Sequence, residues 1–173
     1  MNFQEALEIG KAGESLIARY LLGLGYSVLP IYEKTDAECK GPVLHSAKFG
    51  ALIAPDLLAF KGQRVLWIEA KHKAAFTWYR KTGEWVTGID LHYYQQYLSI
   101  QNERPEWPIW LLFLHMDGIA KDTPGGMTSP TGLFGNALSY LHGNEHHRHE
   151  NHMVYWNVDA LKFLAPLSDV LIP

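Results

Sequence analysis

The stretch that most constrains this chain is "APDLLAFKGQRVLWIEAKHK", residues 54–73, in which two apolar runs flank a short turn at 61–64. Such a pattern predicts two adjacent strands of a buried sheet, joined as a hairpin. Three charges interrupt the runs: Asp56 in the first, and Glu69 and Lys71 in the second. Charges inside a sheet are costly unless they are paired or bind an ion, so their placement needs a chemical reason.

The alternation of side chains along a strand offers that reason. Glu69 and Lys71, two residues apart, point to the same face of the sheet. If the strands pair through the turn, Asp56 approaches Glu69 across the ladder. Two carboxylates that close repel each other unless a cation lies between them, and hard divalent cations prefer carboxylate oxygens. A structural alternative stays open, with Asp56 at a strand end and Glu69 and Lys71 as a solvated pair on an edge strand.

The rest of the chain predicts helices and strands arranged around this hairpin. We expect helices over 2–24 and 89–103 and a short closing helix capped by Asp159, strands over 26–32, 51–60, 64–72, 108–116 and 153–158, and loops over 33–50 and 117–136. We find no internal repeat and no linker long enough to divide domains. The sequence therefore predicts one α/β domain spanning 1–173.

The composition is that of a globular protein. Of the 173 residues, 47% are hydrophobic and 19% charged, enough for one domain with a sizeable core. No apolar run approaches the roughly 20 residues of a membrane helix. The N-terminus lacks the apolar core of a signal peptide, and the single Cys39 suits a reducing compartment. We therefore expect a cytoplasmic protein with no membrane partner. The net charge of −3 gives no support to broad nucleic-acid binding, so such a partner would need a local patch or metal ions.

The spacing of the charges resembles a known nuclease motif. Pro55-Asp56, then twelve residues, then Glu69-Ala70-Lys71, is similar to the pattern of the PD-(D/E)XK nuclease superfamily. The resemblance covers residues 5–116 well and the remainder loosely. It implies the restriction-endonuclease-like fold, also that of Holliday-junction resolvases. In this fold a three-layer core holds a central mixed sheet of four to five strands flanked by helices.

The first predicted helix contributes one more carboxylate. Glu14 falls on its apolar, sheet-facing side, and Gly10 and Gly13 leave room for close approach to the sheet. Many members of the superfamily carry a helical Glu that completes the metal site, which "GKAGES" at 10–15 resembles. A surface Glu on a slightly rotated helix is the alternative.

The resemblance implies a complete site. Asp56 and Glu69 would bind the metal directly, and the Ala70 carbonyl would be a further ligand. Glu14 would bind it directly or through water. Lys71 would orient the attacking water or stabilise the developing charge. The implied catalytic residues are thus Asp56, Glu69, Lys71 and Glu14.

The activity implied is Mg²⁺-dependent hydrolysis of phosphodiesters, with Mn²⁺ as a substitute and with 5′-phosphate and 3′-hydroxyl products. DNA is the expected partner, and the resemblance allows a homodimer. A small nuclease without a recognition domain fits phage or mobile-element DNA metabolism by analogy. The alternative is a nucleic-acid-binding or assembly protein that kept the fold and lost turnover.

Substrate contacts are predicted beside the second strand. The segment "KHKAAFTWYRKTGEW", 71–85, mixes cations with aromatic rings, which suits phosphates and exposed bases. The expected substrate-binding residues are His72, Lys73, Arg80 and Lys81, with His92 and Gln96 on the following helix. Some branches of the superfamily carry a Gln and a Tyr four apart on that helix, and this form is absent here. Equally open is an aromatic hairpin that packs on the domain or on a dimer partner.

The His-rich segment "HGNEHHRHENH", 142–152, permits two interpretations. Its five histidines could bind a transition metal, which would support an unrelated metal-binding protein. However, Gly143 and Asn144 favour a loop, and no Cys lies nearby. The pattern therefore favours a solvated, pH-sensitive loop.

Overall fold

The computed structural model describes residues 3–31, 42–120, 123–149 and 152–171 and, within the first helix, the side chains from Lys11 onward. Its helices are α1 (Phe3–Gly23), α2 (Leu91–Glu103), α3 (Leu138–His142) and α4 (Leu167–Leu171), with a 3-10 turn η1 (Val158–Ala160). The first two match the two long helices that the periodicity predicts. None of the helices in the described ranges is long and apolar enough to cross a membrane.

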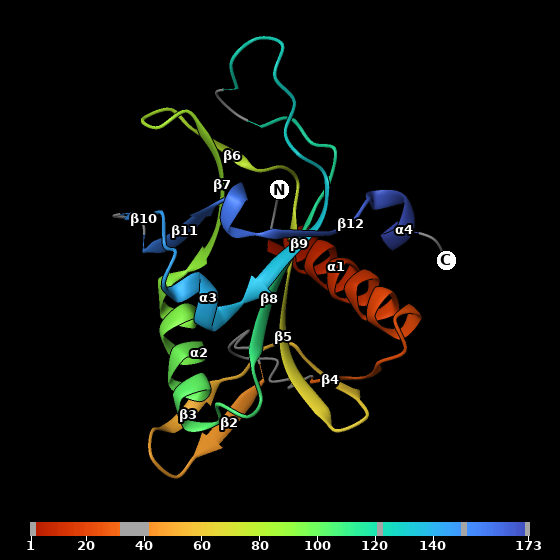
Figure 1. Ribbon diagram of the computed structural model, residues 1–173, viewed down its shortest axis with the longest axis vertical. Coiled ribbons are helices and arrows are strands. Elements are labelled where there is room, and N and C mark those ends of the chain that lie inside the picture. The colour runs from red at the N-terminus through yellow and green to blue at the C-terminus, as the bar shows by residue number, and fades with distance from the viewer. Residues whose placement is uncertain (1–2, 32–41, 121–122, 150–151, 172–173) are drawn as a thin grey trace.

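A mixed sheet of six strands forms the centre of the molecule (Figure 1). Its order is β1 (Ser27–Pro30), β4 (Leu57–Lys61), β5 (Arg64–Lys73), β8 (Ile109–His115), β9 (Gly132–Ala137) and β12 (Lys162–Ala165). Only β5 and β8 run parallel, and α2 lies in the crossover between them. The β4–β5 pairing confirms the predicted hairpin, closed at Lys61 and Arg64. Gly62, at φ 60°, allows the tight turn.

Two smaller sheets complete the fold. One has the order β10 (His147–His149), β11 (Met153–Asn157), β7 (Glu84–Asp90) and β6 (Thr77–Tyr79), and the other pairs β2 (Val43–Ser46) with β3 (Gly50–Ile53). The four-stranded sheet shares a hydrophobic cluster with α2, to which it contributes Trp85 and Trp156. It therefore extends the layer on the α2 side of the central sheet (Figure 1).

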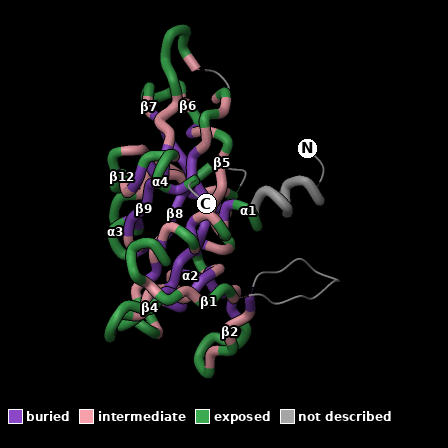
Figure 2. Tube along the Cα trace, turned by 90° about the vertical axis from the view of Figure 1, so that its right-hand side faces the viewer, coloured by how far each residue is buried: buried purple, intermediate pink, exposed green. Residues whose placement is uncertain are grey.

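The two faces of the central sheet bury different helices, because successive side chains of a strand alternate between the faces. Ile68 and Leu112 pack with Ile17 beneath α1. Leu111 and Phe113 pack instead with the inner side of α2. Buried residues accordingly run through the middle of the molecule with exposed ones around them (Figure 2). The predicted mixed sheet flanked by helices is confirmed.

The predicted element bounds need three corrections. The sheet has six strands instead of four to five, because the predicted loop 117–136 contains β9. The strand predicted over 51–60 is two strands, separated at Pro55, which cannot donate to a ladder. The predicted loop 33–50 includes β2 and the β2–β3 turn within its described part, and residues 32–41 lie outside the described chain.

The end of the chain also differs from the prediction. Instead of a closing helix capped by Asp159, η1 is capped by the Asn157 side chain, which accepts from the backbone N–H of Ala160 at 3.0 Å. The following residues form β12, an edge strand, and α4 comes after it. Leu161 and Leu164 fit a helical spacing but belong to the turn and the strand, so the pattern was too short to separate the two periods.

Candidate active site

The candidate site lies where β5 extends beyond its neighbour β4. The β4–β5 ladder ends at the pair Leu57 and Ile68, whereas the pairing of β5 with β8 continues as far as Lys73. Asp56, immediately before β4, closes the gap: its Oδ2 accepts a hydrogen bond from the backbone N–H of Ala70 at 2.9 Å. The N–H and C=O of one strand residue point to the same side, so the Ala70 carbonyl faces this edge too.

Glu69 and Lys71 project together from β5 toward α2. The Glu69 side chain is 1% exposed, and its Oε1 forms an ion pair with Lys71 Nζ. Its Oε2 accepts a hydrogen bond from the Tyr97 hydroxyl of α2 at 2.6 Å. The Lys71 side chain is 31% exposed, and its Nζ lies 6.0 Å from the centroid of the Tyr93 ring. The site is thus a buried carboxylate held from two sides, with its cation reaching the surface.

Glu14 approaches this group from α1 on the opposite face of the sheet. The helix lies close to β5, because a Cβ added at Gly13 would stand 2.4 Å from the Cβ of His72. Burial raises the pKa of Glu14, an effect that the charge of Lys71 opposes and that of Glu69 reinforces. The helical carboxylate therefore shares an electrostatic environment with the two charges on β5.

The pKa values of Asp56 and Lys71 are both raised, for different reasons. Burial raises the pKa of Asp56 well above its ordinary value, and the Glu69 carboxylate raises it further, against the opposing effects of Lys71 and the Ala70 N–H. Burial alone would lower the pKa of Lys71, but the carboxylates of Glu69, Asp56 and Glu14 outweigh it and raise the pKa. The site therefore holds more carboxylates than its one lysine neutralises, which favours a bound cation.

The donor set suits Mg²⁺. It offers carboxylate and carbonyl oxygens and no thiolate, and Mg²⁺ is usually held by one or two carboxylates while it keeps several waters. Among the residues that the structure describes, no three His, Cys, Asp or Glu side chains converge tightly enough to form a metal cage. Asp56 and Glu69 with the Ala70 carbonyl are consistent with such an open site.

The predicted substrate-binding residues are spread over several surfaces. His72 lies on the α1 face beside Gly13, whereas Lys73 shares the face of Lys71. Arg80 and Lys81 are exposed at the tip of the β6–β7 hairpin (Figure 1). The neighbouring Trp78 and Trp85 pack against each other, with ring centroids 5.0 Å apart. These two aromatic side chains therefore pack on the domain.

The two predicted substrate-binding residues of α2, His92 and Gln96, contact each other. Gln96 accepts a hydrogen bond from the backbone N–H of Ile53 in β3, and its side-chain nitrogen lies 2.7 Å from His92 Nε2. Tyr97, which is not among the predicted site residues, contacts Glu69. The sequence feature that could have identified Tyr97 is its position on the buried side of α2, together with Tyr94 and Ile100. A tyrosine hydroxyl buried there needs a hydrogen-bond partner.

His115, at the end of β8, is another buried polar residue that sequence reasoning missed. It is 0% exposed, and its ring stacks on Phe76 with centroids 3.6 Å apart. Neither ring nitrogen has a hydrogen-bond partner in the described chain. Burial, with the charge of Lys73, lowers its pKa to about 3, while a contact with the Ala75 backbone outside hydrogen-bond geometry acts weakly the other way. The imidazole is therefore neutral at physiological pH.

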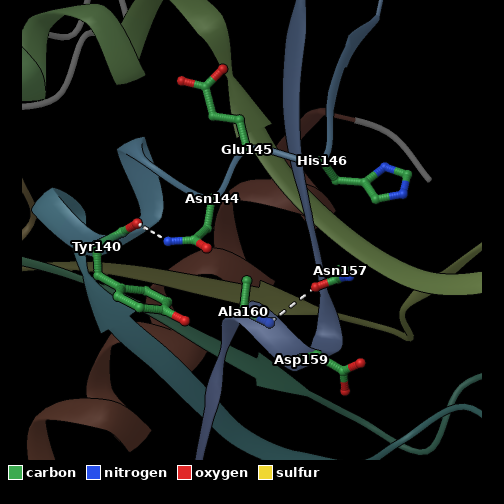
Figure 3. A pocket seen from close by; sticks show the side chains of 7 residues that line it. All are labelled: Tyr140, Asn144, Glu145, His146, Asn157, Asp159 and Ala160. Atoms are coloured by element: carbon green, nitrogen blue, oxygen red, sulfur yellow. Dashed lines mark hydrogen bonds between the residues drawn. The ribbon is translucent and has the colours of Figure 1, made fainter.

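The His-rich segment lies in a different part of the molecule. His146 contacts Glu84 Oε2 at 2.9 Å and His147 Nδ1 at 2.6 Å, and the His147 ring stacks between Tyr79 and Tyr155. A polar pocket of about 500 Å³ lies beside it (Figure 3). The pocket is lined by Tyr140, Asn144, Glu145, His146, Asn157, Asp159 and Ala160. None of the predicted catalytic residues lines it.

Comparison with known proteins supports the fold. No family model matches the chain, and no curated protein matches its sequence. Among solved structures it resembles Hjc, a Holliday junction resolvase from the archaeal hyperthermophile Archaeoglobus fulgidus. The identity is 11% and the TM-score 0.50, over 87% of this chain and 90% of the resolvase. The chain thus shares the fold of that resolvase, which confirms the predicted restriction-endonuclease-like fold.

Proposed function

We propose that this protein is a Mg²⁺-dependent nuclease that hydrolyses phosphodiester bonds in DNA. The observation that carries the proposal is the meeting of Asp56, Glu69 and Lys71 at the open edge of β5. This arrangement occurs in a fold shared with a Holliday junction resolvase, which makes DNA the favoured substrate. A homodimer, which the resemblance allows, stays a prediction.

The proposed metal ligands are Asp56, Glu69 and the Ala70 carbonyl, with Glu14 as a ligand through water. When bound, Mg²⁺ supplies a water of lowered pKa and neutralises charge on the phosphate. Tyr97 keeps the Glu69 carboxylate in one orientation, because its hydroxyl donates to Oε2. The Ala70 N–H does the same for Asp56 from the strand edge. Both carboxylates are thus oriented before substrate arrives.

Lys71 is the proposed catalytic cation. Its ammonium is drawn into the site by Glu69, and nearly a third of its side chain stays accessible. A compact ammonium there can hold the attacking water or stabilise charge that develops on the phosphoryl oxygens. The raised pKa of Lys71 keeps it protonated at neutral pH, so it acts as a donor and a charge and not as a general base.

The test is a cleavage screen over linear, circular, branched and single-stranded DNA with Mg²⁺, Mn²⁺, Ca²⁺ or EDTA. Cleavage should need Mg²⁺ or Mn²⁺, and Lys71→Ala should abolish it. Lys48→Ala, which removes an exposed lysine in the β2–β3 turn, is the matched control and should cleave like the parent. Strong activity in EDTA, or parent-like cleavage by Lys71→Ala, would refute the proposal.

That test needs a folding control. Lys71→Ala leaves the buried Glu69 carboxylate without its cation, which costs about 3–5 kcal/mol for a buried pair. Lys71→Met combined with Glu69→Gln removes both charges together and should melt closer to the parent. A double variant that is folded and inactive would separate loss of catalysis from loss of structure.

A second candidate is a nucleic-acid-binding protein of the same fold without turnover. It is favoured by the ion pair that already engages Lys71, and by the absence of a three-ligand cluster among the described side chains. This candidate predicts DNA binding in Ca²⁺ and no cleavage by the parent with any metal in the screen.

A further inference from the structure

Lys73 is a second cation on the catalytic face of β5. It follows Lys71 by two residues, so both side chains leave the same face of the strand, about 7 Å apart along it. Its register partner on β8 is His115, whose ring closes that end of the face. Lys73 therefore lies beside the buried His115 ring, two residues along β5 from the catalytic lysine.

The two lysines differ in their partners. Lys71 is paired with Glu69, whereas no hydrogen bond or ion pair joins the Lys73 ammonium to another side chain of the described chain. Lys73 is nevertheless partly buried. Its neighbour His115 is wholly buried and has two ring nitrogens without partners. An ammonium that is partly buried and has no partner among the described residues is unusual in a folded protein and points to a ligand that pairs with it.

The electrostatics favour an anion as that ligand. Burial, followed by the charge of Lys71, lowers the pKa of Lys73 to about 8. Among the described residues no carboxylate offsets this effect, since Glu69 on the same face is engaged by Lys71 and Tyr97. His115 from β8 is neutral. An anion beside Lys73 would supply the missing counter-charge.

We propose that Lys73 binds the phosphate group of the substrate strand adjacent to the scissile one. This inference rests on the proposed nuclease function and adds the residue that sets the strand in register with the catalytic group. Lys71 serves the reacting phosphate, and Lys73, one pleat further along β5, holds its neighbour. Lys73 is thus a substrate-positioning residue.

The experiment is a thermodynamic cycle that combines removal of the Lys73 side chain with removal of the charge from one phosphate at a time. Oligonucleotides carrying one neutral methylphosphonate at each position around the cleavage site are bound to parent and to Lys73→Ala, both in Ca²⁺ and in EDTA. At one position adjacent to the scissile phosphate, the parent should lose affinity about tenfold, the scale of one charged hydrogen bond. Lys73→Ala should lose about the same with the unmodified strand and nothing further at that position.

Two variants control the interpretation. Lys48→Ala should keep the full methylphosphonate effect, because it removes an exposed lysine elsewhere. Lys73→Arg retains the charge at every pH and should bind nearly as tightly as the parent near neutrality. Affinity of the parent should fall as pH rises above about 8, because the free ammonium deprotonates there, and Lys73→Arg should lack that fall.

The outcomes separate this proposal from the nuclease assignment. If the effects of Lys73→Ala and of the methylphosphonate multiply at every position while the parent cleaves with Mg²⁺, the register role is wrong and the nuclease stands. Suppose instead that the parent never cleaves, but that a methylphosphonate at one position costs Lys73→Ala no further affinity. The phosphate-binding role of Lys73 then stands and the nuclease assignment fails. If the parent binds no oligonucleotide in either buffer, both are overturned.

Discussion

Replacing His115 by Phe should change how the stability of this protein depends on pH. In the folded protein the pKa of His115 is lowered from its ordinary 6.5 to about 3, chiefly by burial. The unfolded chain therefore binds one more proton than the folded one between these values. Parent stability should fall with that proton as pH drops below about 6.5.

The magnitude follows from the shift. Each pH unit between the two pKa values costs about 1.4 kcal/mol, so the contribution of His115 between about pH 7.5 and 4.5 is roughly 2.5 kcal/mol. A Phe keeps the ring that stacks on Phe76 but binds no proton. As pH falls over this range, the unfolding free energy of His115→Phe should therefore rise relative to that of the parent by about that amount. This holds whatever the stability of the variant at neutral pH.

The assay is urea unfolding at several pH values, monitored by far-UV circular dichroism. The quantity of interest is the difference between the unfolding free energies of variant and parent at each pH, since other titrating groups cancel in it. His45→Gln, at an exposed position of β2, controls for removing a histidine as such. A difference that stays constant from neutral to acid pH would refute the buried, neutral imidazole.

Three further substitutions probe the site. Tyr97→Phe removes the donor to a buried carboxylate and should lower the unfolding free energy by about 1–3 kcal/mol in urea and slow cleavage; unchanged stability would argue against that hydrogen bond. Asp56→Asn should abolish cleavage yet raise Tm in EDTA, because burial and a neighbouring carboxylate disfavour its charge; a lowered Tm would contradict this. Gly13→Ala should lower the unfolding free energy by about 1–3 kcal/mol, since the new Cβ would stand 2.4 Å from that of His72. Gly23→Ala should not lower the unfolding free energy in this way, because its new Cβ would meet nothing within 4 Å. Equal losses of unfolding free energy in the two variants would show that close packing is not the cause.

The core of the candidate site followed from sequence because its geometry is local. A period of two places Glu69 and Lys71 on one face, and a tight turn at 61–64 brings the strand after Asp56 alongside them. These relations need no knowledge of the rest of the fold. The placement of Glu14 was harder, because it depends on how closely α1 approaches β5 around Gly13.

What sequence reasoning missed depends on contacts between distant segments. Tyr97 reaches Glu69 across 28 residues, and His115 meets Lys73 only because β5 and β8 pair in parallel. The strand β9 was hidden by its glycines, which read as loop residues. In the structure Gly135 is required by the sheet, since a Cβ there would stand 2.6 Å from the backbone oxygen of Leu111.

The part of β5 that extends beyond its pairing with β4 has a consequence for solubility. A strand edge with unpaired N–H and C=O groups is a template on which another chain can add a strand and start aggregation. Asp56 occupies the Ala70 N–H with its carboxylate, so a charged side chain blocks the place where a foreign strand would begin to pair. Substitutions at Asp56 that remove the acceptor, such as Asp56→Ala, therefore leave the Ala70 N–H free to pair with another chain, in addition to damaging the site. Asp56→Asn keeps an acceptor there and is the safer choice for preparing an inactive protein in quantity.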